Sequence, residues 1–309
     1  MILKNAREYR PPNRRSDRKF FYKYMTSKVA KIVLANRKLR WSSPLLFNDP
    51  FDVTQELRLN FDEEQLNAVL ADRMASLMEQ GDPSISVKNP VLAALHRMVM
   101  RATPEVRQTM ASELRQGVLP PTSGQIQSFA TLKETWGEMV PTFRVLCLSE
   151  LNDVTPMWLH YADEYKGVVL EFSAVDELDS VFFLARPVVY QDTPPAIADA
   201  NAWVSCMLGQ GGFTYRNLFT EYQYVKTSAW SYEKEWRIVS GARPGESGFF
   251  GDYGFHLYDL TGIYFGLKCS AEDRSDLFAL LTHGLKHVQA HEAFSDGHQA
   301  RFTFRAITR

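Results

Sequence analysis

Hydrophobic and polar positions follow two different spacings along the chain. Short runs rich in β-branched and aromatic residues predict strands, and apolar residues at intervals of three or four predict helices. The predicted strands cover 20–25, 39–43, 143–149, 167–172, 187–191, 235–240, 255–260 and 262–266, with a closing hairpin formed by 287–294 and 299–307. Helices are expected over 27–39, 195–224 and 273–285, the last capped by Ser270. This order of elements predicts an α+β fold with a mostly antiparallel sheet.

Residues 61–141 differ from the rest because helix-forming residues dominate them. Three segments with helical spacing are separated by breaks such as Gly81-Asp82-Pro83. We interpret 61–141 as a helical insertion in a single domain that spans 19–309. Residues 1–18 are polar, contain Pro11-Pro12 and several arginines, and are interpreted as an N-terminal arm.

Composition restricts the class of protein. The chain has 309 residues, of which 23% are charged and 45% hydrophobic, as in an ordinary globular protein. No apolar run approaches the roughly 18 residues that a membrane span needs, so no membrane partner is expected. The N-terminus lacks the apolar segment of a secretory signal. The three widely separated cysteines argue against a disulfide framework and favour a cytoplasmic location.

Charge is distributed unevenly although the net charge is only -1. Residues 1–40 contain 13 Lys/Arg against Glu8 and Asp17, a balance of +11, which leaves -12 on the remainder. A basic arm on an acidic body can contact nucleic acid. It can equally be a solvated tail that folds back on its own acidic surface.

Three polar segments lie at predicted strand ends or in loops, where functional sites are usually found. They are 41–52 with Trp41-Ser42-Ser43 and Asn48-Asp49, 149–167 with Trp158, His160 and Tyr161, and 226–237 with Trp230, Glu233, Glu235 and Arg237. We expect the three segments to converge, so that Asn48, His160 and Glu235 line one pocket. A purely structural interpretation also exists: an Asx-turn at Asn48-Asp49, a core histidine at 160, and a surface ion-pair face at 233–237.

The order of these segments resembles the bacterial domain-of-unknown-function family 2971. The resemblance runs over about residues 20–270 and rests on Phe21–Tyr24, Trp41–Asp52, Cys147–Gly167, Trp230–Arg237 and Ile263–Gly266. Members of that family look like accessory proteins of bacterial phage-defence or abortive-infection systems. The resemblance therefore implies a defence context and no secure activity.

A second resemblance is to the ADP-ribosyltransferase superfamily. An early strand, a helix, a second strand with Ser42-Ser43 and a late strand opening with Glu233-x-Glu235 are similar to its pattern. The resemblance implies a split sheet that holds NAD, and transfer of ADP-ribose to RNA, DNA or protein. The first strand departs from the pattern because it offers Tyr22-Lys23-Tyr24 where an Arg or His is expected.

The resemblance also assigns roles to individual residues. Glu235 would stabilise the ribose cation that forms as nicotinamide leaves, and Glu233 would orient the acceptor. The expected dinucleotide contacts are Tyr24, Ser43, Asn48, Asp49, Trp158, His160, Tyr161, Trp230 and Arg237. No residue is assigned to a metal.

Two other classes of function stay open. A metal-dependent nuclease would use Asp49 with Glu164-x-Lys166 to hold magnesium and steady a water. A non-enzymatic sensor or interaction protein would use the aromatic segments as the edge of a cleft. A zinc site at His283, His287 and His291 is disfavoured because Gly284 interrupts the helix that would align them. The glycines at 209–212 lack the spacing of a Rossmann site.

Overall fold

The computed structural model describes residues 18–53, 57–82, 87, 90–117, 123–193, 195–196, 198–208, 222–295 and 302–308. Two compact units make up the chain. The first, called here the sheet unit, is drawn from the segments Met1–Thr54, Val140–Asp192 and Tyr224–Arg309. The second, the helical unit, is drawn from Gln55–Met139 and Thr193–Gln223. Each is described by itself.

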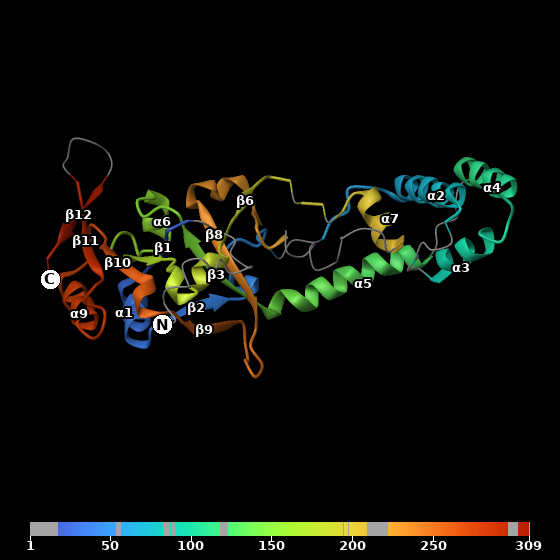
Figure 1. Cartoon of the computed structure of the whole chain (residues 1–309). Helices are drawn as coiled ribbons and strands as arrows, with labels where there is room; N and C mark the ends of the chain where they lie inside the picture. Colours follow the sequence, from blue (N-terminus) through green and yellow to red (C-terminus); the bar gives the residue numbers. More distant parts are fainter. Residues whose placement is uncertain are drawn as a thin grey trace. The chain divides into compact units, whose positions relative to one another are not determined.

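A ten-stranded sheet forms the centre of the sheet unit (Figure 1). Its main path has the order β12-β11-β10-β4-β1-β3-β2-β9, and β8 pairs with both β3 and β5. The strands are β1 (Phe20–Met25), β2 (Lys38–Ser42), β3 (Phe143–Ser149), β4 (Val168–Ser173), β5 (Arg186–Pro187), β8 (Glu235–Gly241), β9 (Phe250–Gly254), β10 (Leu260–Phe265), β11 (Gln289–Phe294) and β12 (Thr303–Ile307). All pairs in it are antiparallel except β10 with β11. A separate parallel pair joins β6 (Val189–Tyr190) to β7 (Val225–Lys226).

The sheet splits next to β3. All seven residues of β3 pair with β8 along one edge, so β1 and β2 must share the other edge. Each contributes a single pair there, Tyr22 with Ser149 from β1 and Ser42 with Val145 from β2. On their other edges, all six residues of β1 pair with β4 and all five residues of β2 pair with β9. The two strands therefore diverge over the middle of β3, where an ordinary sheet would continue its ladder.

Helices cover the sheet where its apolar side chains need burial. α1 (Ser27–Asn36) begins at Thr26, whose hydroxyl caps the amide of Val29. The other helices of this unit are α6 (Thr155–His160) and α9 (Ala271–Leu281), with 3₁₀ turns η1 (Pro44–Leu46), η2 (Val140–Thr142), η3 (Asp176–Leu178), η4 (Val181–Leu184), η5 (Ser228–Glu233) and η6 (Leu257–Asp259). α1 packs against α9, joined by an ion pair from Lys31 to Asp273.

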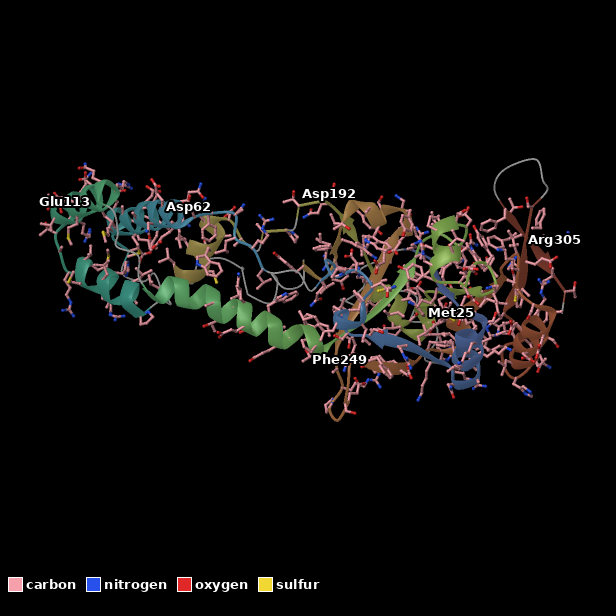
Figure 2. All side chains as sticks on the ribbon, turned by 180° about the vertical axis from the view of Figure 1, so that it is seen from behind. Met25, Asp62, Glu113, Asp192, Phe249 and Arg305 are labelled. Atoms are coloured by element: carbon pink, nitrogen blue, oxygen red, sulfur yellow. The ribbon has the colours of Figure 1, made fainter. Side chains whose placement is uncertain are left out.

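The core of the sheet unit contains apolar side chains from β1, α1, β3, β4, β10 and α9. Figure 2 shows Met25 among its closely packed side chains, and Met25 is buried. A second cluster on Tyr24 and Trp158 includes Phe302 and is built largely of aromatic rings. Both clusters include side chains of β1 and β4, so they fix β1, which borders the split, against its neighbour β4.

The helical unit consists of α2 (Glu63–Gln80), α3 (Pro90–Val99), α4 (Pro104–Gln116), α5 (Ser123–Met139) and α7 (Ala200–Leu208). α2 is capped by Asp62 in a capping box and packs against α4 and α7. Leu70 and Met74 of α2 are fully or almost fully buried. Helices thus occupy most of the predicted insertion, and α7 joins them from a later part of the sequence.

The mixed α+β class and the mostly antiparallel sheet are confirmed. Two local predictions were wrong, and one strand was not predicted. The helix after β1 ends at Asn36 because Arg37 adopts a left-handed conformation with φ 56°. The segment 255–260 is mainly the turn η6, capped by His256, and β9 was not predicted. None of the helices in the described ranges is long and apolar enough to cross a membrane.

Candidate active site in the split of the sheet

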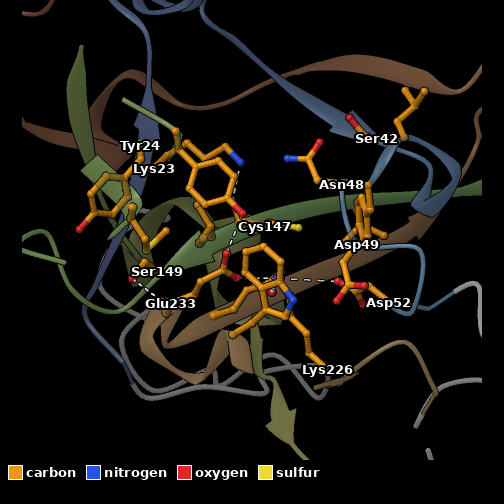
Figure 3. A pocket seen from close by; sticks show the side chains of 18 of the residues that line it. Lys23, Tyr24, Ser42, Asn48, Asp49, Asp52, Cys147, Ser149, Lys226 and Glu233 are labelled. Atoms are coloured by element: carbon orange, nitrogen blue, oxygen red, sulfur yellow. Dashed lines mark hydrogen bonds and ion pairs between the residues drawn. The ribbon is translucent and has the colours of Figure 1, made fainter. Parts of the chain in front are cut away.

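A pocket of about 290 Å³ lies at the split, and all of its lining residues belong to the sheet unit. Three of the strands that meet there contribute Tyr22, Lys23 and Tyr24 from β1, Arg40 and Ser42 from β2, and Val145, Cys147, Leu148 and Ser149 from β3. The remaining lining residues are Leu46, Phe47, Asn48, Asp49, Asp52, Met157, Tyr161, Lys226, Trp230, Glu233 and Glu235. In Figure 3, Asn48 and Asp49 face Lys23 and Tyr24 across the pocket.

Five buried charged side chains form a group on one side of the pocket, which we call the charged cluster. It consists of Asp52, Lys226, Glu233, Glu235 and Arg237, and each side chain is at most 8% exposed. Figure 3 shows Asp52 and Glu233 reaching the cluster from opposite sides. Three carboxylates and two cations leave one excess negative charge when all are ionised.

Arg237 connects two of the carboxylates. Its Nη1 and Nη2 donate to the two oxygens of Asp52 at 2.8 and 2.6 Å. Its Nε donates to Oε1 of Glu235 at 2.7 Å, and Nη2 also donates to Oε2 at 3.0 Å. A planar guanidinium is suited to this bidentate geometry. Because Arg237 is fully buried, these bonds hold Glu235 in one orientation.

Lys226 connects the other pair. Its Nζ donates to Oε2 of Glu233 at 2.5 Å and to Oε2 of Glu235 at 3.0 Å. Asp52 lies 3.8 Å from the same ammonium group. The second oxygen of Glu233 accepts a hydrogen bond from the Tyr161 hydroxyl at 2.7 Å. Glu233 is thus the carboxylate that joins the cluster to a pocket-lining tyrosine.

Local structure explains why Glu233 and Glu235 converge. In an extended segment both side chains would lie on one face. Instead η5 ends at Glu233, and Lys234 takes a left-handed conformation with φ 45° before β8 starts at Glu235. Glu235 and Arg237 then share a face of β8 because side chains alternate along a strand. The turn at Lys234 returns Glu233 to that same cluster.

The two glutamates experience opposite electrostatic environments. Burial raises the pKa of Glu233, and the nearby charge of Glu235 raises it further, against the lowering effect of Lys226. Burial also acts to raise the pKa of Glu235, but Arg237 and Lys226 outweigh it and hold that pKa far below its usual value. Glu235 is therefore a fixed anion, and Glu233 is the carboxyl that takes up a proton more readily.

The structure brings seven of the predicted site residues to the pocket: Tyr24, Asn48, Asp49, Tyr161, Trp230, Glu233 and Glu235. Tyr24 contributes its ring, since its hydroxyl donates to the carbonyl of Leu151 and accepts from the amide of Val154. Asp49 forms the expected Asx-turn, accepting from the amide of Phe51 at 2.8 Å. The ring of Trp230 lies over the ammonium of Lys226, 5.0 Å from it.

Four predicted residues are placed elsewhere. Ser43 is buried and donates to the carbonyl of Val140. Trp158 is buried in the aromatic cluster and donates to the carbonyl of Asn152. Arg237 lies behind the lining, and His160 is exposed at the end of α6. The expected convergence therefore applies to Asn48 and Glu235 but not to His160, which is also not the core histidine of the structural interpretation.

The residues of the nuclease hypothesis do not meet. Asp49 lines the pocket, whereas Glu164 and Lys166 are exposed and pair with each other at 3.6 Å. Within the described ranges, no group of three or more His, Cys, Asp or Glu side chains is arranged to hold a metal. His291 lies on β11 and stacks on Tyr264, away from any helix shared with His283. The glycine segment 209–212 lies outside the described residues.

Several pocket residues were missed in the sequence. Asp52 is the last residue of the polar segment 41–52, and Lys226 is the first residue of the polar segment 226–237. Each segment was singled out because of other residues in it. Lys23, Arg40 and Cys147 lie on predicted strands. The alternation of side chains along a strand does not show that the sheet splits beside β3. Burial raises the pKa of the Cys147 thiol, and the charge of Glu235 raises it further, so this thiol stays protonated near neutral pH.

Comparison with known proteins finds one family whose description matches a segment that contains part of this site. Residues 157–238 match the family described as "Protein of unknown function (DUF2971)". The matched segment includes Tyr161, Lys226, Trp230, both glutamates and Arg237, which is most of the charged cluster. Neither the curated proteins nor the solved structures contain a match to the chain.

Proposed function

We propose that the pocket is an active site for NAD-dependent ADP-ribosyl transfer to a macromolecule, in a bacterial defence or toxin setting. One observation carries the proposal. The Glu-x-Glu pair at the start of β8 lines a pocket at a split in the sheet, and the two carboxyls have pKa values shifted in opposite directions. Such a pair can divide the electrostatic and the proton-transfer roles between two residues.

The reaction breaks the bond between ribose C1′ and the nicotinamide nitrogen, and the electron pair leaves with nicotinamide. The ribose becomes a cation, which the fixed negative charge of Glu235 would stabilise more than it stabilises the neutral ribose. A bond then forms from C1′ to the acceptor, whose proton passes to Glu233. A carboxylate with a raised pKa is a stronger base than an ordinary one, which suits Glu233 to this step.

The size and lining of the pocket agree with one end of a dinucleotide. About 290 Å³ is at the lower limit of the roughly 300–1,000 Å³ typical of small-molecule sites. The nicotinamide and its ribose would therefore occupy the pocket, while the adenosine half would extend from it. Tyr24, Phe47 and Trp230 supply aromatic surface for a planar ring.

The test is an assay of NAD consumption with radiolabelled NAD, purified protein and cell extract. Glu235→Gln keeps the size of the side chain and removes its charge, and should lower turnover by about 10²–10³. Glu233→Gln should also lower turnover, most at the pH where the wild type is fastest. Glu164→Gln is the matched control, because the same substitution on the exposed surface should leave the rate unchanged.

A second candidate is a sensor that binds a nucleotide without turning it over. It is favoured by the hydrogen bonds on every carboxylate oxygen of Glu233 and Glu235. A fully bonded network positions a ligand well but leaves little freedom for proton transfer. NAD binding by wild type without release of nicotinamide or labelling of any macromolecule would support the sensor and contradict the transferase.

A further inference from the structure

The charged cluster gives one side of the pocket an excess of negative charge when all of its groups are ionised. Both of its cations are bonded to carboxylates, and one carboxylate more than the number of cations is buried there. Solvent and salt screen a buried charge only weakly, so it acts strongly on a neighbouring ligand. This side of the pocket therefore favours a ligand group that carries positive charge.

Two aromatic rings extend this preference. Phe47 and Trp230 both line the pocket and are half-buried. One cation of the cluster lies near each ring, with Arg237 5.5 Å from the centre of Phe47 and Lys226 5.0 Å from that of Trp230. A planar cation in the pocket beside these rings would gain both stacking and cation–π attraction.

Positive groups line another part of the same pocket. Lys23 on β1 reaches the middle of β3, where its Nζ donates to the carbonyl of Cys147 at 2.7 Å. Arg40 on β2 is 58% exposed and pairs with the exposed Asp252. An ammonium has three donors, so the bond to Cys147 leaves Lys23 able to bind an anion as well. Both cations can therefore receive an anionic part of the ligand.

A buried oxygen in the pocket wall also points to a ligand. Oδ2 of Asp49 is buried and has no hydrogen-bond partner among the described residues, while Oδ1 is used in the Asx-turn. Buried acceptors are normally satisfied, and one left open beside a pocket is suited to a hydroxyl or amide of a bound molecule. Asp49 adds a further negative charge next to the charged cluster.

We infer that the pocket binds a ligand with a planar cationic ring close to an anionic group, and that it binds oxidised NAD in preference to NADH. The choice of ligand rests on the proposed function. The nicotinamide ring is a cation only in the oxidised form, and the phosphates are the same in both forms. The charged cluster and the rings would thus distinguish the two forms, whereas Lys23 and Arg40 would bind both alike.

Isothermal titration at pH 8 with NAD and with NADH, in the absence of extract, tests this preference. For the wild type we expect NAD to bind about 10–100-fold more tightly, the range given by one desolvated cation–π contact plus one favourable charge. Glu233→Gln removes the excess charge and should reduce the ratio to within about threefold. Lys23→Gln is the control, since it should weaken both ligands and leave the ratio unchanged.

A second variant tests the inference independently if Glu233→Gln fails to fold. Asp49→Asn keeps the Asx-turn and removes a charge at the pocket wall, so it should also lower the ratio. Equal affinities in the wild type, or a ratio that survives both Glu233→Gln and Asp49→Asn, would overturn the inference. Selective binding without nicotinamide release would support it and refute the transferase, and release without selectivity would do the reverse. Absence of binding to either form would overturn both.

Discussion

Arg237 offers the sharpest test of the charged cluster. Arg237→Met keeps much of the length of the side chain and removes the cation that bonds Asp52 and Glu235. The variant leaves three buried carboxylates with Lys226 as their only cation within the cluster. Removing one partner of a buried ion pair typically costs about 3–5 kcal/mol, because the other charge stays buried and uncompensated.

That cost is large enough to measure by thermal unfolding. In a unit of about 150–250 residues, 1 kcal/mol shifts Tm by about 2–4 °C, so Arg237→Met should lower Tm by about 6–20 °C. Calorimetry can assign the loss to the transition of the sheet unit if the two units unfold separately. Arg40→Met is the matched control: its pair with Asp252 is exposed, and such pairs contribute only about 0–1 kcal/mol.

A double variant separates lost charge from lost packing. If uncompensated charge is the cause, Arg237→Met combined with Asp52→Asn should be less destabilised than the sum of the two single variants. Additive effects would show that Arg237 acts through packing against Phe47, and a Tm change as small as that of Arg40→Met would refute the buried network altogether.

Three further predictions concern stability and partners. Gly266→Ala should destabilise by about 1–3 kcal/mol in urea unfolding, because its Cβ would lie 2.2 Å from a backbone oxygen, whereas Gly137→Ala, with open space around it, should not. The lowered pKa of Glu235 stabilises the fold above its ordinary pKa of 4.5, a contribution lost as pH falls below that value. Glu235→Gln removes this contribution and should therefore flatten the acid side of the curve of unfolding free energy against pH. The raised pKa of Glu233 acts on that curve in the opposite sense. Deleting residues 1–18, of which 1–17 lie outside the described residues, should remove oligonucleotide binding at low salt if the basic arm contacts nucleic acid. Unchanged binding would exclude that role.

The sequence by itself determined most of the elements and two parts of the site. β3 and β8 were located within a residue because β-branched and aromatic residues cluster there, and Ser270 marked the start of α9. Glu233 and Glu235 were singled out because they lie in a polar segment next to a predicted strand and because Glu233-x-Glu235 resembles the ADP-ribosyltransferase pattern. Such features depend on neighbours in the chain, which local patterns report well.

The tertiary structure decided what those residues face. The split beside β3 depends on strand pairing, and no local pattern encodes that Tyr22 and Ser42 meet the same edge. Trp158 and His160 looked equally suited to a site, yet packing buried the first in the core and left the second exposed. Asp52 and Arg237 are 185 residues apart, and only folding makes them an ion pair. Burying a charge is costly unless an opposite charge lies beside it, and the tertiary fold of the whole chain decides which residue supplies that opposite charge.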